Sequence, residues 1–165
     1  MKEKPEGRKI KIIQRNRRAF HEFEILQKFE AGIVLEGSEV KALRQGKCSL
    51  QDAYCVIRHH RVDKEDKPEI QAKIVNLYIG RYEQSCNPNY DPRRPRTLLL
   101  HSREIMKLYN AFEQKGLAII PISIYFSGPY VKLEIALAKY KKKYDKREEI
   151  KKRDIEKEVS KKVKF

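Results

Sequence analysis

The chain has 165 residues, enough for one domain of ordinary size, and its net charge is +15, from 38 Lys and Arg against 23 Asp and Glu. No apolar run approaches the roughly 20 residues of a membrane span, and the basic start lacks an apolar stretch of about 7–15 residues, so we expect neither a transmembrane protein nor a secretory signal. Hydrophobic residues make up 40%, enough for a core, and this argues against wholesale disorder.

The positive charge is concentrated at the two ends of the chain. Residues 1–19 hold eight basic and two acidic residues, a net of +6, and residues 139–165 hold thirteen and six, a net of +7. Residues 20–138 carry only +2, from 17 basic and 15 acidic residues. We therefore expect two basic arms, mobile until bound, around a nearly neutral body. Arms that only maintain solubility are the alternative, but two cationic arms on one small body favour a nucleic-acid partner.

The body is expected to be mainly β. The predicted strands are 20–27, 31–35, 53–59, 70–79, 96–100, 118–126 and 130–138. In 118–126 the alternation places Ile120, Ile122, Ile124 and Phe126 on one face. Pro121 has no N–H to donate, so we expect this strand to lie at a sheet edge or to contain a bulge there.

Two helices are predicted between these strands. They cover residues 39–45 and 102–115, and the second is capped by His101-Ser102 and stopped by Gly116. The predicted fold class is a small closed β-barrel of the oligonucleotide-binding type with two or three helices and a basic C-terminal tail, and a β-sandwich is the alternative.

Nothing in the sequence indicates an enzyme, a metal site or a cofactor. The three cysteines form no CxxC pair, which fits reduced thiols in a cytoplasmic protein, and the four histidines have no metal-ligand spacing. Nucleophile and phosphate-loop motifs are missing, and neighbouring acids such as Glu148 and Glu149 lie in polar runs typical of solvated surface.

Two segments carry features of RNA binding. In the loop 91–96, two prolines stiffen a chain that bears Arg93, Arg94 and Arg96, which favours a grip on phosphates, with a rigid solvent loop as the alternative. In the tail, the apolar residues Ile150, Ile155, Val159 and Val163 follow a nearly helical spacing with basic residues around them. The tail is expected to become helical on an anionic partner, although a calmodulin-like or membrane target would select the same pattern.

Taken together, four segments resemble one family. The runs NRRAFHEFEI (16–25), FEAGIVLEGSEVKALRQGKCSLQDAY (29–54), DPRRPRTLLLH (91–101) and ALAKYKKKYDKRE (136–148) are similar, in this order, to the SsrA-binding protein family, also called small protein B. The resemblance implies an oligonucleotide-binding-like barrel without enzymatic activity. It also implies a protein that binds the tRNA-like domain of transfer-messenger RNA and delivers this RNA to stalled bacterial ribosomes for trans-translation. The tail would then fold in the empty mRNA path near the decoding centre.

The resemblance, together with the arginine loop, assigns two sets of residues. The expected RNA-contacting residues are Asn16, Glu30, Lys41, Arg44, Arg94, Arg96, Leu99 and Lys132. The expected ribosome-contacting residues of the tail are Lys139, Lys141, Lys142, Tyr144, Asp145, Lys146 and Arg147. One monomer per tRNA-like domain is implied, with the small-subunit ribosomal RNA as the second partner and no membrane.

This sequence departs from the family pattern at two positions and in one hairpin. Tyr140 replaces a glycine between the basic tail residues, which stiffens the hinge or adds a stacking ring, and Thr97 replaces a residue that is often basic. The hairpin 58–69 is longer than usual.

Two alternative functions remain. One is a generic single-strand-binding or ribosome-assembly module, for which charge would dominate the affinity for RNA, and the other is an RNA-processing enzyme, for which the sequence offers no site.

Overall fold

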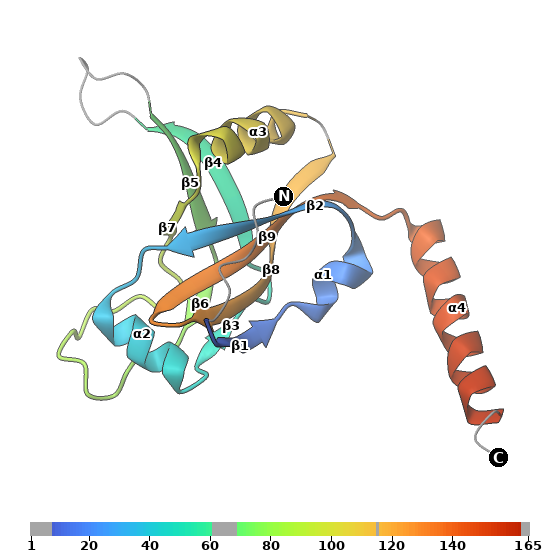
Figure 1. The fold of residues 1–165 in the computed structure, drawn as a ribbon, viewed down its shortest axis with the longest axis horizontal. Helices are drawn as coiled ribbons and strands as arrows, with labels where there is room; N and C mark the ends of the chain where they lie inside the picture. Colours follow the sequence, from blue (N-terminus) through green and yellow to red (C-terminus); the bar gives the residue numbers. More distant parts are fainter. Residues whose placement is uncertain (1–7, 61–68, 115, 163–165) are drawn as a thin grey trace.

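The computed structural model describes residues 8–60, 69–114 and 116–162, and within them the protein is mainly β with four helices (Figure 1). The helices are α1 (Arg17–Glu22), α2 (Gly37–Arg44), α3 (Ser102–Phe112) and α4 (Lys143–Lys162). The strands are β1 (Ile10–Arg15), β2 (Phe23–Ile33), β3 (Cys48–Ser49), β4 (Tyr54–His60), β5 (Glu69–Val75), β6 (Tyr78–Ile79), β7 (Arg96–Leu99), β8 (Leu117–Ser127) and β9 (Tyr130–Tyr140). The tip of the predicted 58–69 hairpin lies outside the described residues.

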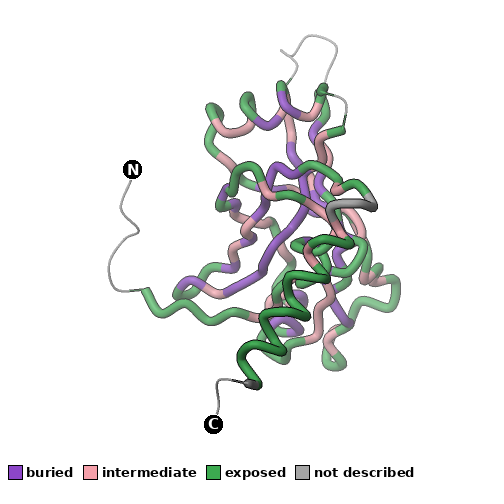
Figure 2. Tube along the Cα trace, turned by 90° about the vertical axis from the view of Figure 1, so that its right-hand side faces the viewer, coloured by how far each residue is buried: buried purple, intermediate pink, exposed green. Residues whose placement is uncertain are grey.

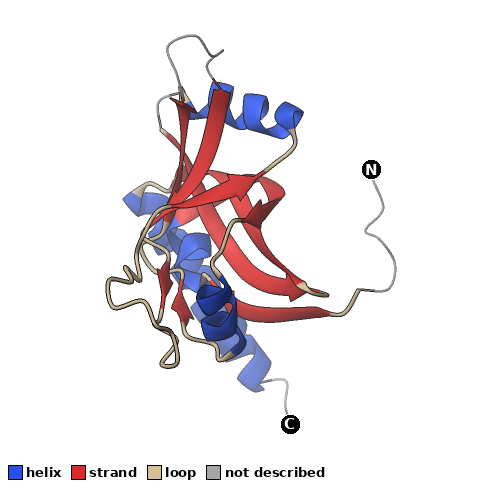
Figure 3. Cartoon of the chain, turned by 90° about the vertical axis from the view of Figure 1, so that its left-hand side faces the viewer, coloured by secondary structure: helices blue, strands red, loops and turns tan. Residues whose placement is uncertain are grey.

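The main sheet is antiparallel and closes on itself. Its seven strands follow the order β1-β8-β4-β5-β7-β2-β9, and β3 pairs with β6 in a separate small sheet. Because β8 also pairs with β9 along nearly its whole length, the six strands β8, β4, β5, β7, β2 and β9 form a ring (Figure 3). The link between β4 and β8 rests on the pairing of Cys55 with Ile119. Each strand of the ring therefore has one face toward an enclosed core and one toward the outside.

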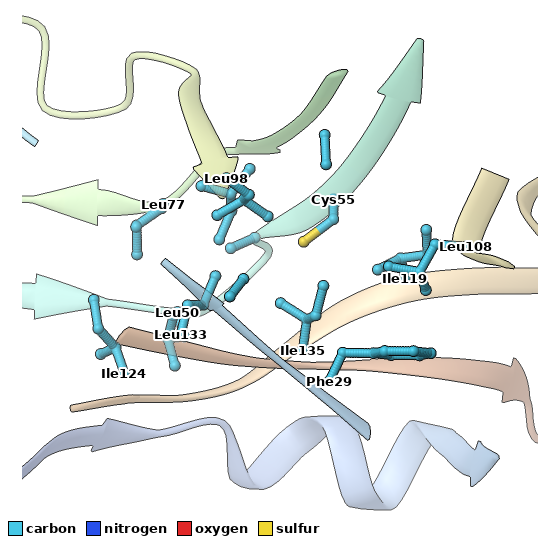
Figure 4. Close-up of a cluster of buried hydrophobic side chains, with 14 of the residues drawn as sticks. Phe29, Leu50, Cys55, Leu77, Leu98, Leu108, Ile119, Ile124, Leu133 and Ile135 are labelled. Atoms are coloured by element: carbon cyan, nitrogen blue, oxygen red, sulfur yellow. The ribbon is translucent and has the colours of Figure 1, made fainter. Parts of the chain in front are cut away.

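The enclosed core is filled by apolar side chains from every strand of the ring. Figure 4 shows several of them, among them Phe29, Leu98, Ile119, Leu133 and Ile135. Two helices cover the openings: α3 adds Leu108 and α2 adds Leu43, each about 1% exposed. Figure 1 shows these helices at opposite ends of the sheet.

Strand β8 contains a bulge at the predicted proline. The register of β8 against β9 shifts between Pro121 and Ser123, which confirms the expected irregularity. The alternative expectation of a sheet edge is wrong, because β8 has β9 along one side and both β1 and β4 along the other.

The bulge also overturns the predicted single apolar face of this strand. Ile124 points into the enclosed core, but Ile120 and Ile122 pack on the outside against Ala19 of α1, in a small second cluster. The extra residue at the bulge reverses the in–out alternation on its two sides.

Part of the basic N-terminal region belongs to the sheet, although its charge predicts a mobile arm. Residues 10–15, which we assigned to a mobile arm, form β1 and pair with β8 from Ile10 opposite Ser127 to Arg15 opposite Ser123. Helix α1 replaces the start of the predicted strand 20–27, because Asn16 caps it by accepting a hydrogen bond from the backbone N–H of Ala19 at 3.3 Å. Beyond α1, β2 is a single strand from Phe23 to Ile33 that joins most of the two predicted strands 20–27 and 31–35, with a register shift against β9 between Ile25 and Gln27.

Helix α4 leaves the body after the end of β9. Figure 2 shows it as an almost entirely exposed rod, in contrast to the buried strands of the ring. Its apolar residues Ile150, Ile155 and Val159 are 48–60% exposed, so they belong to neither hydrophobic cluster of the body. Three of the four predicted stripe residues therefore lie on a helix that is already formed in the isolated chain, where we expected a tail that is mobile until bound, and Val163 lies outside the described residues.

Candidate nucleic-acid interface

Glu30 lies on the outer face of β2 and is held by two donors from neighbouring strands. Tyr125 of β8 donates its hydroxyl and Lys132 of β9 its ammonium group to the Glu30 carboxylate. Burial raises the pKa of Tyr125, and the bond to Glu30 raises it further, so the phenol keeps its proton and remains the donor at neutral pH. The Glu30 side chain is nevertheless 48% exposed, so a carboxylate of fixed orientation faces solvent.

A second carboxylate stands directly beside it. Glu134 of β9 lies opposite Glu30 in the pairing of β2 with β9, and like charges in this position are unfavourable unless compensated. Compensation comes from Lys28, whose Nζ is 3.6 Å from Glu134, and from Ser123, whose Oγ donates to it at 3.1 Å. A cavity of about 470 Å³ opens over this pair, and exposed Phe20 forms part of its wall.

Leu99 and Lys132 flank one glycine in a single row across three strands. Gly32 of β2 pairs with Leu99 of β7 on one side and with Lys132 of β9 on the other. Leu99 is 59% exposed, although it is flanked by a buried leucine, Leu98. A Cβ at position 32 would lie 3.2 Å from the Leu99 Cβ, so the absence of a side chain at Gly32 lets the leucine sit close to the lysine. The structure thus brings Glu30, Leu99 and Lys132 together on one outer face.

Arg96, by contrast, lies inside the protein, and its assignment to the RNA-contacting set is wrong. Its side chain has no exposed surface, and Nε donates to Glu39 at 2.8 Å while Nη1 donates to the carbonyl of Leu77 at 2.7 Å. A phosphate cannot reach a guanidinium group buried in this way. Arg96 instead joins β7 to α2 through Glu39. The one feature of the sequence that could have indicated this buried pair is Glu39 itself, the single acidic residue on a helix that otherwise carries basic residues.

Arg94 shares the same carboxylate. It donates to Glu39 through Nε at 3.0 Å and Nη2 at 2.6 Å, and its side chain is 29% exposed. Burial by itself raises the pKa of Glu39, but the hydrogen bonds from Arg94 and Arg96 outweigh it and hold that pKa below its ordinary value. Tyr90 also donates to Glu39, at 3.3 Å, and burial together with this carboxylate raises the pKa of Tyr90 to about 12. The arginine loop is therefore built mainly to hold the fold, with Arg93 its exposed member.

The remaining predicted body residues fall into two groups. Asn16 uses its amide within the protein, because its oxygen caps α1 and its Nδ2 donates to the carbonyl of Pro121 at 3.1 Å. Asn16 therefore has a structural role, and its RNA contact stays a prediction. Lys41 and Arg44 are both exposed on α2, and Lys41 lies over the ring of Tyr82 with its Nζ 5.4 Å from the centroid.

The tail residues begin where β9 meets α4, and Lys141 anchors this junction. Its Nζ donates to the backbone carbonyl of Phe20 at 3.0 Å and to Glu149 of α4 at 2.5 Å, which lowers the pKa of Glu149. Lys139, Lys142 and Arg147 are exposed, and the side chains of Tyr144 and Asp145 lie outside the described part of the structure.

Tyr140, the replacement for the family glycine, makes an aromatic contact at the same junction. Its ring meets the ring of Phe23 edge-on, with centroids 5.3 Å apart. Lys146 of α4 lies over the same ring, its Nζ 4.5 Å from the ring centroid. Tyr140 thus makes an edge-on aromatic contact and a cation contact at the hinge, and the sequence suggested a stiffer hinge or a stacking ring as the two possibilities.

Several outer-face residues were missed by the sequence reading. The alternation in β8 and β9 predicts that Tyr125 and Glu134 face outward, but it does not indicate that they meet Glu30 and Lys28 across the sheet.

No group of His, Cys, Asp and Glu among the described residues is arranged to hold a metal ion. Within the same residues, none of the helices has the length and apolar composition that crossing a bilayer requires. All three cysteines are free thiols, and burial raises the pKa of Cys48 to about 11.

Three features place the protein in the class of small basic RNA-binding proteins. They are the ring-shaped sheet, the paired Glu30 and Lys132 on its outer face, and the basic helix α4. Comparison with known proteins specifies this class. The family model described as SmpB protein matches residues 13–165. The chain belongs to this family.

Curated relatives and a solved structure agree with the family match. The SsrA-binding proteins of Carboxydothermus hydrogenoformans and Sulfurihydrogenibium sp. are 45% and 46% identical over 151 and 154 residues, covering 92% and 93% of this chain and 95% of each relative. That of Persephonella marina is 46% identical over 155 residues, 94% of this chain and 95% of the relative. A solved chain described under "tmRNA-SmpB: a journey to the center of the bacterial ribosome" is 41% identical, with a TM-score of 0.59, over 83% of this chain and 93% of that one.

Proposed function

We propose that this protein binds transfer-messenger RNA through its tRNA-like domain and delivers it to bacterial ribosomes stalled on messages without a usable stop codon. The observation that carries the proposal is the family match over residues 13–165, because it spans both the body and the tail. The relatives are named for binding SsrA, and the similar solved structure is described as tmRNA–SmpB at the bacterial ribosome.

The ring of six strands serves as an oligonucleotide-binding barrel in this proposal. Its closure by β8 and β9 and its covering helices α2 and α3 are features of that architecture. Because β1 and the last residues of β9 pair within the sheet, we place the RNA-binding body at residues 10–140, wider than the predicted 20–138. The tail then begins at Lys141.

Three residues on one outer face would divide the work of RNA recognition. The Glu30 carboxylate is held by Tyr125 and Lys132 with part of its surface open, so it can accept hydrogen bonds from the amino and imino groups of a base. Leu99 offers an exposed apolar surface to a base or ribose. Lys132, beside it, supplies the positive charge for a phosphate.

The tail would occupy the empty mRNA path near the decoding centre. Helix α4 already has the form of an extended basic rod, and Lys139, Lys142 and Arg147 are exposed for contacts with ribosomal RNA. In the family, the position of Tyr144 stacks in the decoding centre, and we propose the same role here.

The proposed role is binding and delivery, and it requires neither catalysis nor a cofactor. Each tRNA-like domain would take one monomer in the cytoplasm, where both transfer-messenger RNA and ribosomes are found. A competition binding assay at 0.15 M salt tests the recognition step. Transfer-messenger RNA should displace alanine tRNA and an unrelated hairpin RNA from the full-length protein, whereas equal competition by all three would overturn specific recognition in favour of a generic charge-driven module.

A further inference from the structure

The outer face of β4 and β5 carries a groove that is separate from the Glu30 site. It has a volume of about 450 Å³ and is lined by Tyr54, Val56, Arg58, His59, Gln71, Lys73, Val75 and Pro95. The pairing of β4 with β5 sets these side chains side by side, with Val56 opposite Lys73 and Arg58 opposite Gln71. The groove therefore lies across two adjacent strands, β4 and β5, whose ribbons run side by side in Figure 1.

The charged side chains that line this groove are all positive. Its described lining residues include two cations, Arg58 and Lys73, and no carboxylate. None of the ion pairs in the described part of the chain uses either cation, whereas Lys28 and Lys132 on the Glu30 face are both paired. An uncompensated positive groove on the surface of an RNA-binding body attracts phosphate groups.

An aromatic ring stands at one end of the groove. Tyr54 is 46% exposed, although its neighbours in the sequence, Ala53 and Cys55, are buried. The opposite wall is fixed by His59, whose Nε2 lies 2.8 Å from the hydroxyl of Tyr109 on α3 and whose ring meets the Tyr109 ring edge-on. An exposed ring beside cations on a sheet face is the combination by which single-stranded nucleic acids are bound through stacking and charge.

The groove lies beside the strand that contains Leu99. Lys73 of β5 lies opposite Thr97 of β7, two residues before Leu99 on the same strand. Neighbouring strands are about 4.8 Å apart, so β4 is roughly 10 Å from β7 across the outer face. An RNA strand that contacts Leu99 can therefore enter the groove without leaving the surface of the protein.

We propose that this groove is a second RNA subsite, in which Lys73 and Arg58 hold backbone phosphates and Tyr54 stacks on a base of the same RNA that contacts Leu99. The inference rests on the proposed function, because it takes the RNA at Leu99 to be the tRNA-like domain of transfer-messenger RNA. It assigns part of the affinity for that RNA to two strands, β4 and β5, that do not contribute to the Glu30 site.

The test measures the affinity of full-length protein for the isolated tRNA-like domain over a range of salt concentrations. The double variant Arg58→Gln/Lys73→Gln should bind about tenfold more weakly, and its slope of log K against log salt should be smaller by about 1.4, as expected for two lost phosphate contacts. The matched control Arg103→Gln/Lys107→Gln removes the same charge from exposed positions on α3 and should stay within twofold of the wild type. Equal behaviour of the two double variants would overturn the proposal.

A second measurement separates stacking from charge and identifies the occupant. Tyr54→Ala should weaken binding at least about fivefold with an unchanged salt slope, and Tyr54→Phe, which keeps the ring, should restore most of it. A photo-crosslinking phenylalanine at position 54 should attach to the RNA in the complex. Crosslinks only to a second copy of this chain or to a ribosomal protein would overturn the subsite. If wild-type protein showed no preference for the tRNA-like domain while the groove variants still lost affinity, the proposed function would fail and the groove would stand.

Discussion

Arg96 and Glu39 form an ion pair that is completely buried, with Nη2 of the arginine 2.7 Å from Oε1 of the glutamate. The pair joins β7 to α2, and Arg94 completes it from the loop before β7. Every buried polar side-chain atom among the described residues has a hydrogen-bond partner, so the network is fully satisfied. The arginine loop 91–96, which the sequence suggests as a phosphate-binding segment, therefore holds α2 against the ring of strands through Arg94 and Arg96.

Replacing the shared carboxylate should destabilise the fold. Glu39→Gln leaves the wholly buried Arg96 without a charge partner and Arg94 with only the more distant Glu36, and should lower the free energy of unfolding by about 3–5 kcal/mol. Urea denaturation measures this loss. The control Glu36→Gln, at a half-exposed partner 3.9 Å from Arg94, should cost less than about 1 kcal/mol. Similar small losses in both variants would contradict the assigned role of Glu39.

The same pair predicts a dependence of stability on acid pH. The pKa of Glu39 in the folded protein lies below its ordinary value of 4.5, so the unfolded chain takes up the proton first as the pH falls. The stabilisation is thus fully present above about pH 4.5 and is lost as the pH falls through the folded pKa. The difference in unfolding free energy between wild type and Glu39→Gln should be constant from pH 7 to about 5 and shrink below pH 4.5. A difference that stayed constant to pH 3 would refute the lowered pKa.

Adjacent leucines on β7 should separate binding from folding. Leu99 is 59% exposed, so Leu99→Ala should change the unfolding free energy by less than about 0.5 kcal/mol while weakening binding to the tRNA-like domain severalfold. Leu98 is 3% exposed in the core, so Leu98→Ala should cost about 2–5 kcal/mol. Paired urea titrations and RNA-binding isotherms make this comparison. Unchanged RNA affinity in Leu99→Ala would remove that residue from the interface.

Much of the architecture was accessible from the pattern of residues, because alternation and helix caps are local signals. The hairpin of β8 and β9, helix α3 with its His101 cap, and the position of Lys132 outside the apolar face of β9 follow from such patterns, whereas Leu99 was assigned only through the family resemblance. The exceptions are contacts between distant segments. The basic segment 10–15 forms a strand because β8, more than a hundred residues later, offers it a free edge.

In the candidate site, too, local patterns were predictable from the sequence and contacts between distant segments were not. Arg96 cannot be distinguished from a surface arginine until α2 is folded against β7 and presents Glu39. Tyr125 could not be matched to Glu30 because the two are 95 positions apart in the chain. A bulge, likewise, is visible locally as Pro121, but its effect on which isoleucines enter the core depends on the register with β9.

The aromatic contact at the hinge should restrict the tail. Tyr140→Gly restores the family's residue and removes the cation contact with Lys146 of α4, which contributes about 0.5–1 kcal/mol to the placement of the helix, and with it the edge contact with Phe23 of β2 that orients the ring. Amide hydrogen exchange in residues 146–162 should become faster, with little change in β2 and β8. Tyr140→Phe keeps the ring and should behave like the wild type. Unaltered exchange in Tyr140→Gly would show that the ring does not brace the helix.

The delivery role is tested most directly by tagging of a nascent peptide on stalled ribosomes in a reconstituted translation system. The system contains transfer-messenger RNA charged with alanine and a message without a stop codon, and it receives full-length protein, a chain ending at Lys142, or no protein. The truncated chain keeps β9 whole and should retain its affinity for the tRNA-like domain, because α4 lies outside the sheet. We predict that only the full-length protein supports tagging, whereas equal tagging without any protein, or with the chain lacking α4, would contradict the account.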